Sequence, residues 1–588
     1  MKIIRPVHLI LAGLVLLLLA SCGPAALTPS PTSFPVPSLT PSPSPLSPTA
    51  APEGLSVSGV VLSDPDGVPL AGATVRIRTT GNARTTDSTG HFTLSGLATG
   101  ESVSISAWVS GYAINGVAGV LPGAANVEIL LRLITEADNP DYAWQPSIYH
   151  EGQGENQGCA QCHSAAATGL AFLLPVDEWL LDAHAQSTVN PRFMTMYTGS
   201  DVNGNRSPLT QYALSRDYGR FPLPPDLTQP YFGPGYKLDF PDTAGNCAAC
   251  HVPVAAIDTP YDVDPAQVSG VAAEGIPCDF CHKVWDVRLD AATGLPASNM
   301  PGVLSFEFRR PLEGAQFFAG PFDDVFPGED TYSPIQRQGQ FCAPCHYGVF
   351  WDTQVYNSFG EWLASPYSAA GIGKTCQDCH MPHGNATSFA RPDQGGTLRD
   401  PQTIFSHLMP GASSTELLQN AVTMTVNASR QGDQITVEVT ILNDRTGHDV
   451  PTDSPLRQVL LLVQAAGPDG GPLVQVDGPR LPDWAGVGNP AQGYYAGLPG
   501  KAYARILEEL WTGVSPTGAY WNPTRVVSDN RLPALGSDTS TCTFTAPAGG
   551  SVTINVSLLY RRAFIQLMDW KGWDMPDIVM DVERVEIP

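Results

Sequence analysis

Five short segments of the chain combine two cysteines and a histidine in the order Cys-x-x-Cys-His. They are Cys159/Cys162/His163, Cys247/Cys250/His251, Cys278/Cys281/His282, Cys342/Cys345/His346 and Cys376/Cys379/His380. Two thiols three positions apart can form thioethers with the two vinyl groups of one haem, and the adjoining imidazole can bind the iron. With 12 Cys and 12 His in 588 residues, chance gives on the order of 0.005 such segments. The spacing predicts five covalently attached haems of the c type.

Two other uses of paired cysteines compete with haem attachment. Structural zinc sites combine two Cys-x-x-Cys pairs, and five pairs that are each followed by His do not divide in that way. Disulfides within such pairs are strained redox bridges rather than structural links. The count of 12 Cys also fits haem attachment, because ten serve five haems and two remain. Of these two, Cys542 lies in an expected strand as an inert buried thiol, and Cys22 has a separate role.

Each iron needs a sixth ligand, and five further histidines are available once His8 and His91 are set aside. They are His150, His184, His383, His407 and His448. Five spare imidazoles for five irons predict mostly bis-histidine haems. Methionine ligation from Met194, Met196 or Met409 is the minor alternative.

The surroundings of the spare histidines differ. His184 lies in EWLLDAHAQS (178–187), within an expected helix over 176–187, which makes it a good axial ligand. A related segment, EWLASPYSAA (361–370), has Tyr367 where His184 would fall. His383 follows His380 too closely to reach the same iron, so it would bind the iron of a neighbouring haem or else contact a propionate or backbone group. His150, nine residues before Cys159, has an equally open role.

The N-terminal residues indicate export. Lys2 and Arg5 precede an apolar run over 9–20 that is typical of a secretory signal and too short to span a bilayer. The following Leu-Ala-Ser-Cys resembles a bacterial lipobox, which implies that Cys22 carries the lipid; the alternative is an ordinary signal peptide. Residues 23–54 are rich in Pro, Ser and Thr and form an expected linker after the signal peptide 1–22.

Alternating apolar residues predict strands at both ends of the folded chain. The first set lies within 55–134, where SGVVLSDPDGVPLAGATVRIRTTG resembles a carboxypeptidase regulatory-like domain, a small seven-stranded sandwich. Strands also recur at 422–426, 434–442, 457–465, 541–544, 551–560 and 577–587, which predicts a larger β-sandwich over 415–588. Between them, 135–414 combines Cys and His with short helical stretches and Gly/Pro-rich loops. The expected fold is multidomain: a small β-sandwich, a loop-rich, mainly α multihaem domain and a C-terminal β-sandwich.

Part of the chain also resembles a group of multihaem enzymes. The segments FCAPCHYGVFWDTQVYNSFGEWLASPYSAAGIGKTCQDCHMPH, SHLMPGA and TGHDVPTDSPLRQVLLLVQA resemble cytochromes related to hydroxylamine oxidoreductase and pentahaem nitrite reductase. The resemblance covers roughly 140–470 and implies closely packed haems, with His407 and His448 as axial ligands. The chain has no Cys-x-x-Cys-Lys segment, so the open catalytic haem of the nitrite reductases is not visible.

These observations favour an exported, lipid-anchored, periplasmic or cell-surface electron-transfer protein over an enzyme. Its expected partners are redox proteins, such as other cytochromes or a quinol-oxidising complex, and a membrane reached through the lipid. A net charge of −25 argues against nucleic acid as a partner. Two alternatives remain: a reductase of a small nitrogen or sulfur compound with one open haem, and an adhesion module with accessory haems.

Overall fold

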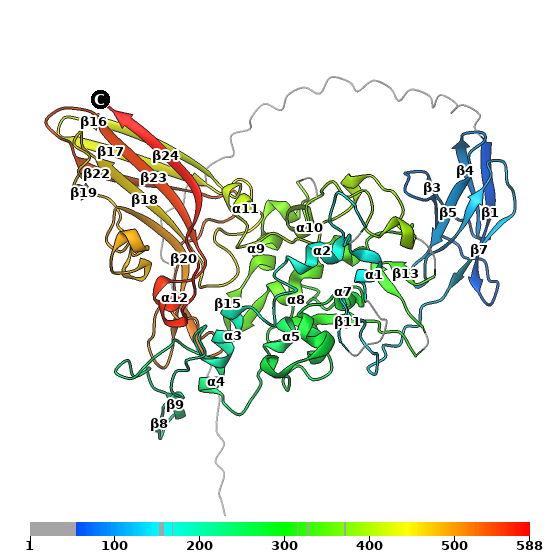
Figure 1. Ribbon diagram of the computed structural model, residues 1–588, viewed down its shortest axis with the longest axis horizontal. Helices are drawn as coiled ribbons and strands as arrows, with labels where there is room; N and C mark the ends of the chain where they lie inside the picture. Colours follow the sequence, from blue (N-terminus) through cyan, green and yellow to red (C-terminus); the bar gives the residue numbers. More distant parts are fainter. Residues whose placement is uncertain (1–54, 152–157, 167, 314, 326–327, 370–371) are drawn as a thin grey trace, which may run out of the picture. The chain divides into compact units, whose positions relative to one another are not determined.

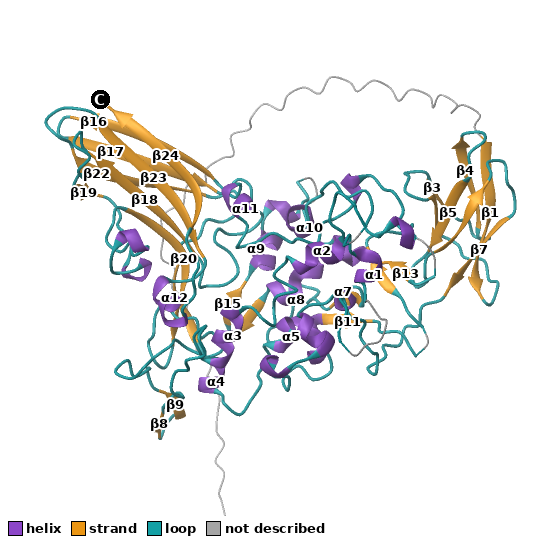
Figure 2. Ribbon diagram, viewed as in Figure 1, coloured by secondary structure: helices purple, strands orange, loops and turns teal. Residues whose placement is uncertain are grey.

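The computed structural model describes residues 55–588 apart from 152–157, 167, 314, 326–327 and 370–371. The expected signal peptide, the linker and Cys22 lie outside the described residues. Figure 1 follows the chain by colour, and Figure 2 separates helices from strands. Strands concentrate at the two ends of the described chain, and short helices lie between them. None of the described helices has the length and apolar composition needed to cross a membrane.

The first region is an all-β structure, as its alternating sequence predicts, and it has the seven strands that the family resemblance implies. Its two sheets have the strand orders β4-β1-β7 and β3-β2-β5-β6, with β1 antiparallel to β4 and parallel to β7. Apolar side chains of both sheets, among them Val61, Leu94 and Ile105, form one core. The strands are β1 (Leu55–Asp64), β2 (Thr74–Ile77), β3 (Ala83–Thr85), β4 (His91–Leu97), β5 (Val103–Trp108), β6 (Asn115–Val120) and β7 (Val127–Arg132).

The middle of the chain is not mainly α, and this part of the sequence prediction is wrong. Its longest described helix has eight residues, and loops connect most of its elements. The helices are α1 (Ala160–His163), α2 (Pro175–Leu180), α3 (Pro191–Thr198), α4 (Tyr236–Asp239), α5 (Ala248–His251), α6 (Pro253–Ala256), α7 (Cys278–Cys281), α8 (Ala343–His346), α9 (Ser358–Ala364) and α10 (Cys376–His380). Gly199 ends α3, and a proline stands two residues after the last residue of α5, α9 and α10.

Short strands and 3-10 turns fill the rest of this region. The strands pair as β8 (Tyr212–Ser215) with β9 (Gly219–Pro222), β10 (Val284–Val287) with β11 (Phe306–Phe308), β12 (Phe318–Gly320) with β13 (Asp330–Tyr332), and β14 (Gly348–Phe350) with β15 (Thr353–Tyr356). The turns are η1 (Pro265–Gln267), η2 (Gly270–Glu274), η3 (Gly302–Ser305), η4 (Pro334–Arg337), η5 (Gly339–Cys342), η6 (Pro366–Ser368), η7 (Pro392–Gln394) and η8 (Pro401–Thr403).

The C-terminal region consists of two larger sheets with the orders β16-β17-β22-β19 and β21-β20-β18-β23-β24. Each strand segment predicted from alternation in this region forms a strand. The elements are α11 (Thr415–Gln419), β16 (Thr423–Gln431), β17 (Gln434–Leu442), β18 (Gln458–Ala466), β19 (Gln475–Asp477), η9 (Asp483–Ala485), η10 (Pro490–Gln492), β20 (Gly500–Glu509), β21 (Thr524–Asp529), β22 (Ser537–Thr545), β23 (Val552–Arg561), α12 (Ile565–Lys571) and β24 (Ile578–Ile587). Val437, Leu461 and Val556 contribute to one core shared by both sheets.

Candidate haem-binding centre

The five Cys-x-x-Cys-His motifs adopt the same local structure. Each forms a single helical turn whose first cysteine stands at or directly before its start: α1, α5, α7, α8 and α10. In three motifs the histidine N–H donates to the carbonyl of the first cysteine, as in the 2.9 Å bond from His163 to Cys159. Residues three and four positions apart share one face of a helical turn. The fold therefore presents two thiols and an imidazole together, as attachment to one haem requires.

The motif cysteines are all free thiols, and some of them touch across motifs. A hydrogen bond with Cys278 and burial raise the pKa of Cys159, which links the first motif to the third. The pKa of Cys345 is raised by a hydrogen bond with Cys250 and by burial, which links the second and fourth motifs.

The remaining motif joins the same group. A hydrogen bond with Cys376 and burial raise the pKa of Cys342, and the same bond lowers the pKa of Cys376. Cys281 of the third motif also raises the pKa of Cys342 and Cys345. The five motifs thus form one connected cluster within the described part of the chain.

Three motif histidines are oriented by backbone carbonyls. The Nδ1 atoms of His163, His282 and His380 lie 2.7, 2.6 and 2.7 Å from the carbonyl oxygens of Phe389, Ala319 and Pro410. A ring nitrogen that donates to a carbonyl fixes the tautomer and leaves Nε2 available to a metal. Sequence reasoning missed these carbonyls, because they come from segments 30 to 226 residues away.

Burial favours the neutral form of the candidate ligands. It lowers the pKa of His251 and of His407 to about 4, and it lowers the pKa of each of the other motif histidines and of His448. A metal binds the neutral imidazole, so these sites do not have to expel a proton near neutral pH.

Two of the spare histidines face a motif histidine across a short gap. The ring centroids of His380 and His448 are 6.3 Å apart, and those of His184 and His346 are 6.4 Å apart. Two imidazoles on opposite sides of one metal need a centroid separation of roughly 6 Å, since each metal–nitrogen bond is about 2 Å long. The residues present therefore fit iron bound between two imidazoles.

His407 lies near two motif histidines. Burial is the largest cause of the lowered pKa of His407, and the nearby imidazoles of His282 and then His163 lower it further. Its backbone N–H donates to the Glu178 carboxylate at 2.7 Å.

His184 does not lie in a helix, contrary to the sequence prediction. Helix α2 ends at Leu180. The Asp182 carboxylate then accepts a hydrogen bond from the backbone N–H of His184, and one of its oxygens lies 2.7 Å from His184 Nδ1. Asp182 thus orients the imidazole after the helix has ended, and the sequence prediction did not include this residue.

The structure places the other two spare histidines differently. His150 has its Nε2 2.6 Å from the buried carboxylate of Glu274. His383 is exposed, and its Nδ1 lies 2.8 Å from the carbonyl of Ile404. These contacts bring neither His150 nor His383 together with a motif histidine.

The motif histidine His251 packs on an aromatic side chain. The ring of Phe193 lies face to face with the His251 ring, and the two ring centroids are 3.7 Å apart.

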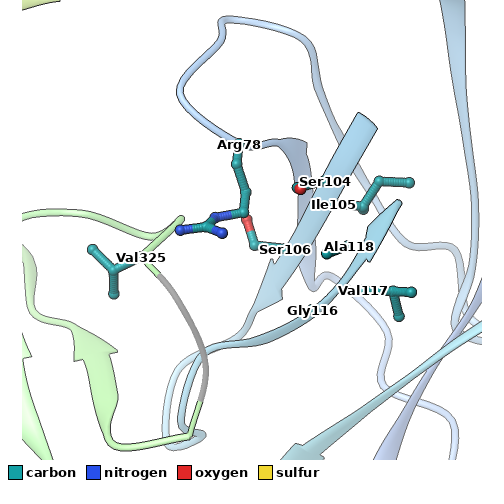
Figure 3. A pocket seen from close by; sticks show the side chains of 8 residues that line it. All are labelled: Arg78, Ser104, Ile105, Ser106, Gly116, Val117, Ala118 and Val325. Carbon is teal, nitrogen blue, oxygen red and sulfur yellow. The ribbon is translucent and has the colours of Figure 1, made fainter. Parts of the chain in front are cut away.

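Among the described residues, no three or more His, Cys, Asp or Glu side chains converge in a way that could hold a metal ion. A hollow lined by Ile105, Val117, Arg78 and Val325 has a volume of about 10 Å³ and would hold at most one water molecule (Figure 3).

Comparison with known proteins identifies one part of the chain. Residues 56–131 match the family model of the carboxypeptidase regulatory-like domain, which confirms the prediction for the first region. The search of curated proteins found no match.

Three solved structures show limited similarity. A pentahaem cytochrome c552 from Thermochromatium tepidum is 17% identical, with a TM-score of 0.48, over 73% of this chain and 97% of that one. Two mutants of a type II cohesin–X-dockerin complex from Acetivibrio cellulolyticus are 28% and 24% identical, each with a TM-score of 0.12. They cover 13% and 18% of this chain, and 57% and 64% of their own. These likenesses carry no argument about function.

Proposed function

We propose that the chain is an exported, lipid-anchored pentahaem cytochrome c that transfers electrons. The proposal rests on a chain with five haem-attachment motifs in which two spare histidines face motif histidines. The ring centroids of His380 and His448 are 6.3 Å apart, and those of His346 and His184 are 6.4 Å apart. Bound haem supplies one-electron reduction and oxidation at iron. An iron with two imidazoles has no open position for a substrate, which favours electron transfer over catalysis.

The protein residues have defined tasks in this function. The motif cysteines hold the porphyrins covalently, and the carbonyls of Phe389, Ala319 and Pro410 keep three imidazoles in the tautomer that can bind iron. Contacts between the motifs bring the attachment points close together, as conduction through a chain of haems requires. The net charge of −25 supports docking to redox proteins with basic surfaces.

The test begins with the exported, purified protein. Its intact mass should include five porphyrins, and its pyridine haemochrome spectrum should give five haems per chain. In paramagnetic resonance, His448→Ala and His184→Ala should each convert roughly a fifth of the iron from low to high spin. A colourless protein without added porphyrin mass would overturn the proposal. A Cys22→Ser variant tests the anchor, because it should move from the membrane to the soluble fraction.

A second candidate function is reduction of a small nitrogen or sulfur compound at one open haem. It is favoured by His150, which faces Glu274 rather than a motif histidine, and by Phe193, which packs on His251. In this case the untreated protein should show one high-spin iron and turn over nitrite, hydroxylamine or tetrathionate. Five low-spin irons without turnover would exclude it.

A further inference from the structure

Two segments of the middle region share a sequence pattern that is repeated in their contacts. One begins in α2 with Glu178-Trp179, and the other begins in α9 with Glu361-Trp362. Six positions after each glutamate stand His184 and Tyr367. The two segments are 183 positions apart, and different motifs follow them, so each shared contact is an independent observation.

Each tryptophan binds the backbone just before a haem-attachment motif. Trp179 Nε1 donates to the carbonyl of Ile276 at 2.9 Å, and Trp362 Nε1 donates to the carbonyl of Lys374 at 2.8 Å. Ile276 stands two residues before Cys278, and Lys374 stands two residues before Cys376.

A second hydrogen bond holds each of the same two residues, Ile276 and Lys374. The N–H of Ile276 donates to the carbonyl of His184 at 3.1 Å, and the N–H of Lys374 donates to the carbonyl of Tyr367 at 2.9 Å. Both segments therefore hold the residue that leads into a motif by its N–H and by its carbonyl. Trp179 and Trp362 are themselves buried, with 4% and 9% of their surface exposed, so these bonds are shielded from water.

Each glutamate binds the loop that carries a spare histidine. Glu178 accepts the backbone N–H of His407 at 2.7 Å, and Glu361 accepts the N–H of Asp449, the residue after His448, at 3.2 Å. The partners lie 229 and 88 positions away in the sequence. In each copy, the tryptophan therefore contacts the backbone just before a haem-attachment motif, and the adjacent glutamate contacts the remote loop that carries a spare histidine.

The two copies differ in one function. Asp182 and Ser365 both accept the N–H of the residue two positions later, which is His184 in one copy and Tyr367 in the other. His184 faces His346 of a different motif, whereas the Tyr367 hydroxyl donates to the carbonyl of Asp444 at 2.9 Å. The first copy therefore also offers an axial imidazole, and the second copy offers none.

We infer that the two Glu-Trp pairs are copies of one positioning device, each of which aligns the two axial histidines of a single haem. Glu178-Trp179 assigns His407 to the haem held by Cys278 and Cys281, and Glu361-Trp362 assigns His448 to the haem held by Cys376 and Cys379. The inference rests on the proposed haem binding and deepens it. The 6.3 Å separation of His380 and His448 supports the second assignment independently of the Glu-Trp contacts.

The two glutamates differ in how firmly they are held. Glu361 and Arg531 are each 5% exposed and form a 2.6 Å ion pair, and Arg531 also binds Asp449 and Asp529. Thr452 donates to the same Glu361 carboxylate. Removing Glu361 would leave the Arg531 charge buried with fewer partners, so this variant carries a folding cost in addition to any effect on haem ligation. Glu178 is therefore the cleaner position for a test.

The test compares spin states in the full-length exported protein. Glu178→Ala should convert the same single haem to high spin as His407→Ala, about a fifth of the iron, and the double variant should convert no more than either alone. Combining Glu178→Ala with His448→Ala should convert two haems. Glu178→Gln should stay low-spin, because an amide oxygen still accepts the N–H of His407. Glu416→Ala, at an exposed position in α11, is the matched control and should change nothing.

The assignment of each pair is tested in the same way. His282→Ala and His407→Ala should affect one common haem, whereas His380→Ala and His407→Ala should affect two. If Glu178→Ala is not exported intact, Glu178→Asp replaces it, since the shorter carboxylate keeps its charge but loses reach. Five low-spin haems in Glu178→Ala, or in Glu178→Asp where that variant replaces it, would overturn the inference. A wild-type protein without porphyrin mass would instead overturn the proposed function, so the two failures are distinguishable.

Discussion

The middle region and the C-terminal region are built on different kinds of core. In the C-terminal sheets, 25 buried apolar side chains of the described chain form one continuous cluster. The largest such cluster in the middle region has nine, and it includes Ala248, Ala249 and Phe280 from within two motifs. A cluster of nine is small for a region of this length, because the conformational entropy lost on folding grows with the number of residues. In the proposed function, haems would complete the core of the middle region.

Withholding haem is the most severe way to test this difference. Protein made in a compartment without haem attachment should lose the structure of 135–414, because too little apolar surface remains buried. The sheets over 415–588 should still fold around their own side chains. Limited proteolysis with mass identification should leave resistant fragments of the C-terminal region and of the first region, and none of 135–414. Equal resistance of both regions would contradict the comparison.

A cavity in the C-terminal core should have a large but local effect. Leu461→Ala removes a fully buried side chain of β18, which should lower the free energy of unfolding by about 3 kcal/mol. Urea unfolding followed by near-ultraviolet circular dichroism measures the change. Val582→Ala, at a position 55% exposed on β24, is the control and should cost less than about 0.5 kcal/mol. The haem spectrum should not change in either variant.

Cys542→Ala should have a smaller effect and leave all five haems in place. Cys542 is fully buried in β22, and burial raises its pKa to about 11, so the thiol is inert at neutral pH. Loss of one sulfur from the core should cost about 1 kcal/mol. Mass spectrometry counts the porphyrins, and a variant with four would show that Cys542 takes part in attachment.

The smallest expected effect is the pH dependence contributed by Asp330. Burial, followed by Glu329, raises the pKa of this carboxyl to about 7. The folded chain then holds a proton that the unfolded chain releases above its ordinary pKa, so stability falls as pH rises from about 4 to about 7. Between these pH values the free energy of unfolding of Asp330→Asn should fall by about 1 kcal/mol less than that of the wild type, because asparagine does not ionise. The effect is small because the Asp330 side chain is only half-buried. Urea midpoints at pH 5 and pH 8 compare the variant with wild type, and an unchanged difference would contradict the assignment.

The sheets were the part of the fold most open to prediction from sequence. Alternation of apolar residues over 434–442 and 551–560 predicts strands directly, and both form as β17 and β23. The mainly α middle was a wrong prediction, because its described helices end after one or two turns. The helix expected over 176–187 is an example, since Asp182 captures the N–H of His184.

The sequence by itself determined the five motifs and the number of spare imidazoles, because thioether attachment depends only on local spacing. The tertiary structure alone decided which imidazole faces which motif. His448 and His380 are 68 positions apart, and no local pattern joins them. The repeated Glu-Trp pair was visible as a sequence likeness, yet its contacts with Ile276, Lys374, His407 and Asp449 were not. Such contacts arise only when remote backbone segments pack together and satisfy one another's hydrogen bonds.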